Sequence, residues 1–140
     1  GASERGTITG LYTVLVDGDD LTEPIADAVR SILDGHIVLS RQLADRNHYP
    51  AIDVLRSVSR VMDNIVSPEH KLAAGRFRDV LATYRESEDL INIGAYVGGS
   101  NARIDQAVAM IDSLNEYLRQ AKDERASYEE AVDRLLALAG

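Results

Sequence analysis

The sequence of 140 residues contains no cysteine, and this absence excludes disulfide bonds and metal sites built from thiolates. Its three histidines, His36, His48 and His70, do not follow the spacing of a metal-binding motif. No run of apolar residues approaches the roughly 20 that a membrane-spanning helix needs. A Gly-x-x-x-x-Gly-Lys-Ser/Thr loop is also missing, so we expect no segment of this sequence to cradle nucleotide phosphates in that way.

Acidic residues outnumber basic ones, 23 against 15, which gives a formal net charge of −8. This balance argues against nonspecific binding to nucleic acid or to anionic lipid. A hydrophobic content of 45% with 27% charged residues is typical of a globular chain. The length suffices for one domain or for two small pieces that share an interface. Partners must therefore be sought in local patches of the surface.

The first forty residues follow a strand–helix–strand pattern. Residues 7–16 are β-branched and apolar almost without interruption, which predicts a strand buried on both faces of a parallel sheet. Thr22 and Pro24 are suited to the start of a helix, which we expect to continue to Leu33. Residues 36–40 predict a short second strand. The acidic residues between the first strand and the helix, Asp17, Asp19 and Asp20, lack the ligand spacing of a calcium loop, so we expect a solvated turn.

Two strands cannot form a stable parallel sheet, so we expect this unit to lie at the side of a larger sheet. We therefore interpret the chain as a fragment, and Gly1 as a cut inside a longer chain or a tag remnant. As a consequence, the unpaired sheet edge and the exposed apolar face of this unit should drive self-association or partial disorder.

The second half of the sequence predicts helices. A short helical turn at residues 41–46 is followed by a loop at 47–50. Ser67 as a cap and Pro68 in the first turn predict a helix that continues to about residue 93. Two more helices are predicted at residues 102–120 and 126–138, from apolar residues at helical spacing. Glycines between residues 94 and 101 predict a flexible, exposed tip between the first two of these helices.

Between the two halves lies Tyr-Pro-Ala-Ile-Asp-Val-Leu-Arg-Ser-Val-Ser-Arg-Val-Met, residues 49–62. The proline biases Tyr49 to an extended backbone. An arginine among apolar anchors, such as Arg60, can direct a rigid charged fork at a phosphate or a carboxylate. The residues alone favour a plainer interpretation, in which Arg60 caps a helix or pairs with a carboxylate and Tyr49 packs on Pro50.

The residue sequence of this motif resembles the end of the catalytic core in the rotary ATPase superfamily. Together with residues 8–16 and 27–41, it is most similar to the flagellar type III export ATPases (the FliI family), with the injectisome ATPases close behind. The resemblance extends from about Gly1 to about Gly99 and is dense up to Ile93.

The resemblance implies a fold of α/β plus all-α type. Residues 1–66 would be the C-terminal edge of a RecA-like parallel-sheet core, and residues 67–140 a C-terminal helical domain. The parent family hydrolyses ATP with Mg²⁺ as a homohexamer at the cytoplasmic face of the inner membrane. Its expected partners are a coiled-coil stalk protein, a regulator, export substrates and their chaperones. ATP and Mg²⁺ would be bound mainly by a preceding part of the parent, so we expect these residues alone not to hydrolyse ATP.

The resemblance also assigns roles to individual residues. Arg60 matches the arginine that reaches across the subunit interface to the γ-phosphate of the neighbour's ATP; such an arginine finger contributes roughly 10³–10⁵ in rate. Arg56 ranks second. Tyr49 matches the tyrosine that stacks on adenine. The tip, with Gly94, Tyr96, Gly98 and Gly99, occupies the place where the family touches its stalk, although a plain helix connector is the alternative.

Two other interpretations remain. The helices and the glycine tip would also suit a non-catalytic helical docking module. Such a module has no use for the buried type of strand predicted at residues 7–16. A fragment of an F-type ATP synthase subunit is disfavoured, because Ala-Tyr-Val-Gly-Gly at residues 95–99 replaces the acidic lever sequence of the F-type β subunit.

Overall fold

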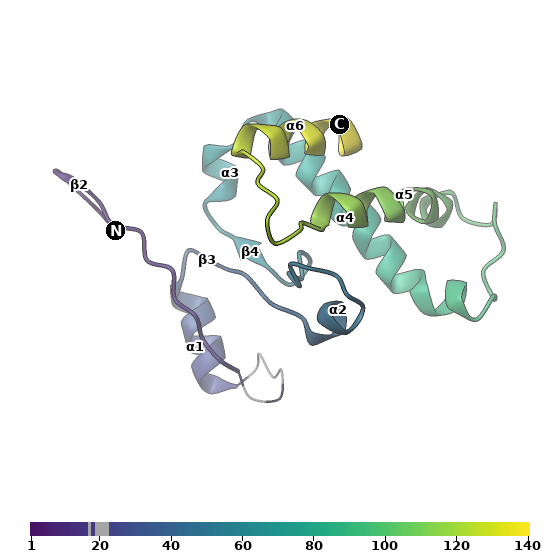
Figure 1. The fold of residues 1–140 in the computed structure, drawn as a ribbon, viewed down its shortest axis with the longest axis horizontal. Helices are drawn as coiled ribbons and strands as arrows, with labels where there is room; N and C mark the ends of the chain where they lie inside the picture. The colour runs from purple at the N-terminus through teal and green to yellow at the C-terminus, as the bar shows by residue number, and fades with distance from the viewer. Residues whose placement is uncertain (17, 19–22) are drawn as a thin grey trace. The chain divides into compact units, whose positions relative to one another are not determined.

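The computed structural model describes residues 1–16, 18 and 23–140, which form two units, Gly1–Leu33 and Asp34–Gly140 (Figure 1). The predicted acidic loop (Asp17, Asp19 and Asp20) and the predicted cap Thr22 lie outside the described residues.

In the first unit, β1 (Ala2–Ser3) and β2 (Gly6–Thr7) form a small antiparallel hairpin. Residues 8–16 have no regular secondary structure and are largely exposed; Leu11, for example, is 94% accessible. The predicted buried strand at residues 7–16 is therefore not formed. A strand buried on both faces needs neighbouring strands and covering layers, and the described part of this unit offers residues 8–16 neither.

The helix expected after this segment is confirmed as α1 (Pro24–Ile32), with Pro24 in its first turn. Glu23 stands at its N-cap and makes no side-chain capping bond.

The second unit begins with β3 (Gly35–His36), which pairs antiparallel with β4 (Val58–Ser59). The strand predicted at residues 36–40 is thus shorter than expected. Its pairing is antiparallel and within its own unit, so the described residues form no parallel βαβ sheet. Local packing explains this partner, because a Cβ at Gly35 would lie 2.6 Å from the carbonyl oxygen of Val58. Only glycine allows the two strands to approach so closely.

Two short helices frame the motif at residues 49–62. The predicted turn at residues 41–46 is confirmed as α2 (Arg41–Asp45), which Ser40 caps by accepting from the amide of Leu43. After β4 follows α3 (Met62–Ile65).

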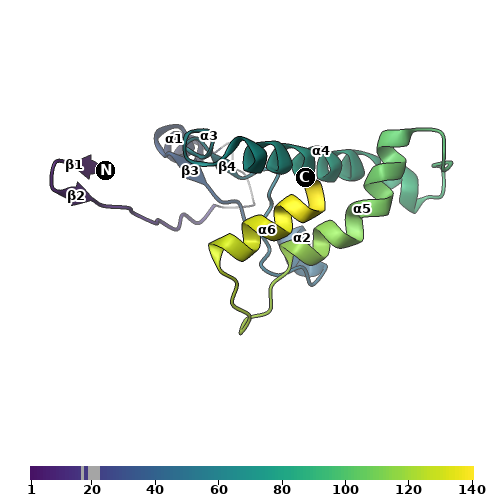
Figure 2. The same ribbon diagram turned by 90° about the horizontal axis from the view of Figure 1, so that it is seen from above.

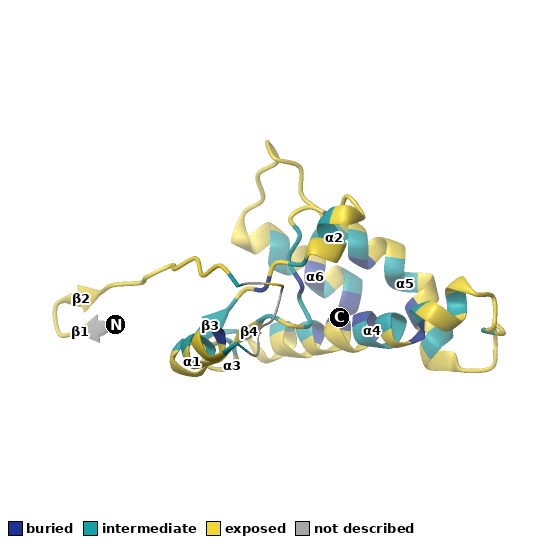
Figure 3. Cartoon of the chain, turned by 90° about the horizontal axis from the view of Figure 1, so that it is seen from below, coloured by how far each residue is buried: buried dark blue, intermediate teal, exposed yellow. Residues whose placement is uncertain are grey.

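The remainder of the unit is a helical bundle of α4 (Pro68–Asn92), α5 (Ala102–Leu118) and α6 (Tyr128–Ala139). Figure 2 shows α6 and α5 along one side of α4, and Figure 3 shows the buried residues on the facing surfaces. The buried core consists of Ala73, Phe77, Val80, Leu81, Ala107, Leu114, Leu135 and Ala139. The half-buried Tyr117 packs against this core, and the centroid of its ring lies 5.4 Å from that of Phe77 in a tilted arrangement.

Local caps decide where these helices begin. Ser67 accepts from the amide of His70, as the sequence predicted, and Asn101 caps α5 through the amide of Arg103. The last helix starts two residues later than expected, because Ser127 and Glu130 form a reciprocal capping box. None of the described helices is long and apolar enough to cross a membrane.

The tip between α4 and α5 is exposed, as expected, but it is tied down by side chains. Gly94 and Gly99 adopt positive φ angles of 70° and 85°. The hydroxyl of Tyr96 donates to Asp105 Oδ1 at 2.8 Å, and the amide of Gly99 donates to the same carboxylate. Desolvation and the bond to Asp105 raise the pKa of Tyr96. Asp105 in α5 therefore holds the tip in a defined shape, which the glycine content alone did not indicate.

Candidate functional site

The segment from Asp53 to Ser57, here called the arm, precedes β4 and Arg60. Its first residue, Asp53, is buried and accepts from the amides of Leu55 and Arg56 through Oδ1. The hydroxyl of Ser57 donates to the carbonyl of Asp53 at 2.7 Å and accepts from the amide of Val38 at 3.0 Å. The polar residues of the motif thus fold the arm into a compact turn beside β3.

Arg60 follows directly after β4 and is exposed. Its amide donates to the carbonyl of Asp34 at 2.8 Å, and the hydroxyl of Ser59 accepts from the amide of Met62. The backbone on both sides of Arg60 is therefore fixed. Arg56 is also exposed, and its carbonyl accepts from Nε2 of His36 at 3.2 Å.

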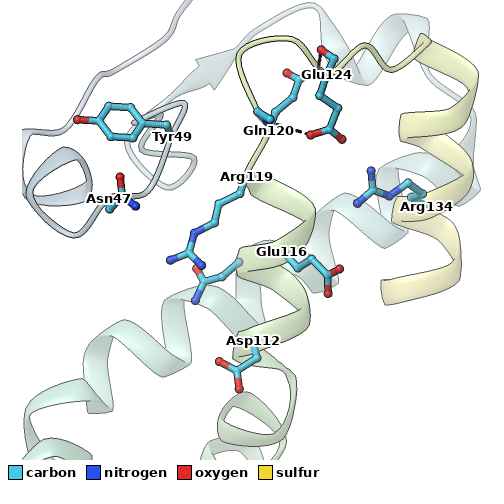
Figure 4. A pocket seen from close by; sticks show the side chains of 10 residues that line it. Asn47, Tyr49, Asp112, Glu116, Arg119, Gln120, Glu124 and Arg134 are labelled. Carbon is cyan, nitrogen blue, oxygen red and sulfur yellow. Dashed lines mark hydrogen bonds between the residues drawn. The ribbon is translucent and has the colours of Figure 1, made fainter.

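Tyr49 forms one wall of an open pocket of about 770 Å³ (Figure 4). Its side of the pocket also includes Asn47, and its ring is about half exposed. The other walls come from α5, from the loop after it and from α6: Asp112, Asn115, Glu116, Arg119, Gln120, Ala121, Glu124 and Arg134. The amide of Gln120 donates to the carbonyl of Tyr49 at 3.0 Å and holds the two sides together.

The pocket combines an aromatic ring with polar groups of both charges. Arg119 extends from the end of α5 to the side of the pocket where Asn47 lies, while Arg134 points in from α6 (Figure 4). In the loop, Glu124 accepts from the amide of Ala121 at 2.9 Å. The pocket can therefore receive a flat ring against Tyr49 and offer hydrogen-bonding groups at the edge of that ring.

His48 lies immediately beside Tyr49 and is buried. Burial, with the nearby guanidinium groups of Arg119 and Arg85, lowers its pKa below the ordinary value of 6.5. Within the described part of the chain, its Nε2 has no hydrogen-bond partner. The environment of His48 thus favours its neutral form.

The predicted site residues fall in three separate places. Tyr49 lines the pocket, whereas Arg60 is not among its lining residues. The tip residues Gly94, Tyr96, Gly98 and Gly99 lie beyond the far end of α4, a helix of 25 residues and about 37 Å.

Comparison with known proteins decides the family. The family described as "T3SS EscN ATPase C-terminal domain" matches residues 66–137. The family described as "ATP synthase alpha/beta family, nucleotide-binding domain" matches residues 1–59. The chain belongs to the type III secretion ATPase family.

Individual relatives agree with this assignment. The flagellum-specific ATP synthase of Bacillus subtilis is 56% identical over 100% of this chain and 32% of its own length. The type 3 secretion system ATPase of Sinorhizobium fredii is 58% identical over 94% of the chain and 29% of its own length. Among solved structures, the assembled EscN ATPase of enteropathogenic E. coli, in complex with its central stalk EscO, is 42% identical with a TM-score of 0.88. That match covers 100% of this chain and 33% of EscN, so the chain spans about a third of the length of its relatives.

The predicted fold class agrees with this family, whereas the domain boundary predicted at residue 66 stays a prediction. Among the described residues, no group of three or more His, Asp or Glu side chains could hold a metal ion. The described residues therefore do not form a magnesium site by themselves.

Sequence reasoning missed the second wall of the pocket. Arg119 and Gln120 are the last two residues of the helix predicted at 102–120, whereas α5 ends at Leu118, and nothing in their spacing indicates that they face Tyr49. They are about seventy positions from Tyr49 in sequence, and a packed helix brings them there. The polar run that ends the helix was the one available signal.

Proposed function

We propose that this chain is the C-terminal part of an ATP-hydrolysing type III protein export ATPase. The complete protein would act as a homohexamer at the cytoplasmic face of the inner membrane, on export substrates delivered by chaperones. Support comes from the family of the chain and from relatives named for flagellar and type 3 secretion systems. ATP with Mg²⁺ would be bound mainly by a part of the protein other than this chain.

In this assembly Arg60 would be the catalytic residue, reaching the γ-phosphate of ATP held by the neighbouring subunit. One observation carries this proposal: Arg60 is exposed on a fixed backbone and is not among the residues that line its own chain's pocket. Phosphoryl transfer spreads negative charge over the equatorial oxygens, which a planar guanidinium can stabilise. A finger of this kind acts in trans, because its own subunit's nucleotide site lies elsewhere.

Tyr49 would flank the adenine ring. Its half-exposed ring forms the wall of a pocket whose opposite side includes Arg119, Gln120 and Ala121. The bond from Gln120 to the carbonyl of Tyr49 fixes the spacing of the two walls. An aromatic face suits any purine, so hydrogen-bonding groups at the rim would have to select the base.

The tip would contact the stalk protein through Gly94, Tyr96, Gly98 and Gly99. The EscN relative was solved in complex with its central stalk. In this chain, the carboxylate of Asp105 holds the tip in a defined shape, and Val97 is exposed beside Tyr96. A rigid tip with an apolar residue is suited to transmit contact from a coiled coil.

The experiment that tests this function replaces Arg60 by alanine in the full-length protein. We expect kcat to fall by at least about a hundredfold with little loss of ATP affinity. Mixing with subunits that retain Arg60 but lack a working phosphate loop should restore part of the activity, because the finger acts across the interface. Normal turnover by Arg60→Ala would show that the arginine has no catalytic role.

A further inference from the structure

Helix α4 reaches the arm through two arginines on one face. Arg78 donates to the carbonyl of Leu55 at 3.3 Å and to the carbonyl of Ser57 at 3.4 Å. Arg85, two turns further along, donates to Asp53 at 2.7 Å. The helix thus holds the arm at its first, third and fifth residues.

The arm has little regular structure of its own. It is a turn followed by the two-residue strand β4, and strands this short contribute little independent stability. Hydrogen bonds to Val38 and His36 fix the arm beside β3, and its position relative to α4 depends on the side chains that reach it from that helix. Arg85 pairs with a carboxylate that is 8% exposed, whereas its own side chain is 32% exposed. Arg78 donates through both terminal nitrogens of its guanidinium, a two-pronged geometry that a lysine ammonium cannot reproduce.

Arg60 follows the arm by three residues, with β4 in between. Resting on the function proposed for Arg60, we infer that Arg78 and Arg85 are positioning residues, which hold the arm so that Arg60 is directed at the neighbouring subunit's nucleotide. Neither residue touches the nucleotide; each acts through Arg60.

The physical reason is the steep dependence of catalysis on geometry. Displacement of a catalytic group by about 1 Å can cost on the order of a hundredfold in rate, even when the substituted residue is remote. Loss of Arg78 or Arg85 would release the arm from α4 without removing the pocket beside Tyr49. The expected signature is a fall in kcat with an unchanged KM for ATP.

The test uses the full-length ATPase with Arg78→Met, Arg78→Lys and Arg85→Met. We expect the methionine variants to lower kcat by roughly 10- to 100-fold and to change KM by less than about twofold. Arg78→Lys should recover only part of the loss. Arg103→Met is the matched control, because Arg103 of α5 forms a 2.7 Å pair with Asp79 of α4 and has no described contact with the arm. Its kcat should stay within about twofold of the parent.

A double-mutant comparison separates positioning from general stability. If Arg78 and Arg85 act through Arg60, their replacement in an Arg60→Ala protein should cause no further loss of kcat. Losses that multiply with that of Arg60→Ala, or normal kcat in both methionine variants, would overturn the inference. Should Arg85→Met fail to fold, Arg78→Met decides the matter, because Arg78 is exposed. Normal turnover by Arg60→Ala alone would instead contradict the proposed function.

Discussion

Two apolar stretches of this chain lie in opposite environments. Five of the nine residues at 8–16 are leucine, isoleucine or valine, yet the segment is largely exposed. The inner face of α4, with Ala73, Phe77, Val80 and Leu81, is instead buried against α5 and α6. Helices satisfy their hydrogen bonds within one segment, so three of them can form a core alone. A central strand must find both its hydrogen-bond partners and its covering layers in other segments.

The contrast is sharpest between two leucines of identical chemistry, Leu114 in α5 and Leu11 in the exposed stretch. Leu114 is fully buried, and its replacement by alanine should lower the free energy of unfolding by about 2–5 kcal/mol. Leu11→Ala should change it by less than about 0.5 kcal/mol. Urea unfolding of the 140-residue chain, followed by circular dichroism at 222 nm, measures both. A comparable loss for Leu11 would mean that residues 8–16 bury apolar surface in the isolated chain.

Ion pairs of α4 extend the comparison to charged groups. Asp53→Asn leaves Arg85 without its buried partner and should cost about 2 kcal/mol of unfolding free energy, because the remaining exposure of Arg85 lets water replace part of the bond. Asp79→Asn removes an exposed pair of the same 2.7 Å length and should cost less than about 1 kcal/mol. Equal losses in urea unfolding would show that burial does not separate the two pairs.

Helix caps offer a smaller contrast. Ser127→Ala removes half of the capping box of α6 and should lower the free energy of unfolding by about 1 kcal/mol. At the start of α1, Glu23 makes no side-chain capping bond, so Glu23→Ala should have almost no effect. Thermal unfolding at pH 7 compares the two variants. Glu130→Gln should destabilise the chain less below pH 4.5 than at pH 7. Capping lowers the pKa of Glu130, so the stabilisation that its carboxylate contributes is lost when the carboxylate is protonated.

The smallest effect at neutral pH concerns the buried His48. Its pKa is lowered in the folded chain, so on acidification the unfolded chain takes up the proton first. Stability should therefore fall as the pH drops below about 6.5 and level off below the folded pKa. His48→Gln should remove this dependence, while His70→Gln should retain it. Urea unfolding between pH 5 and pH 8 would contradict the assignment if both variants kept the same slope.

The prediction from sequence was most accurate for helices. Ser67, Pro68 and the apolar spacing after them predicted α4, and its start was confirmed at the expected residue. These signals are local, because a cap acts within three residues and a helical face repeats every turn. The strands were predicted less well. Residues 7–16 have the composition of a buried strand, but composition cannot supply the strands that would pair with them.

The candidate site divides in the same way. The family resemblance of residues 49–62 named Tyr49 and Arg60, and their roles stay proposals. Sequence reasoning did not identify the residues of the wall opposite Tyr49 or the arginines that hold the arm. The bond between Arg85 and Asp53 joins residues 32 positions apart, and only the folded chain brings them together.

By itself, the sequence determined the helical segments, the cap of α4 at Ser67, the acidic net charge and the family of the chain. Each of these depends on the composition of the chain, on residues that are neighbours along it, or on the residue sequence of a contiguous motif. Tertiary structure alone decided which strand pairs with β3, how Asp105 shapes the tip, and which side chains of α4 form hydrogen bonds with the arm. Those outcomes depend on contacts between residues that are not neighbours along the chain. Such contacts stabilise the protein only after the segments that carry them have packed together.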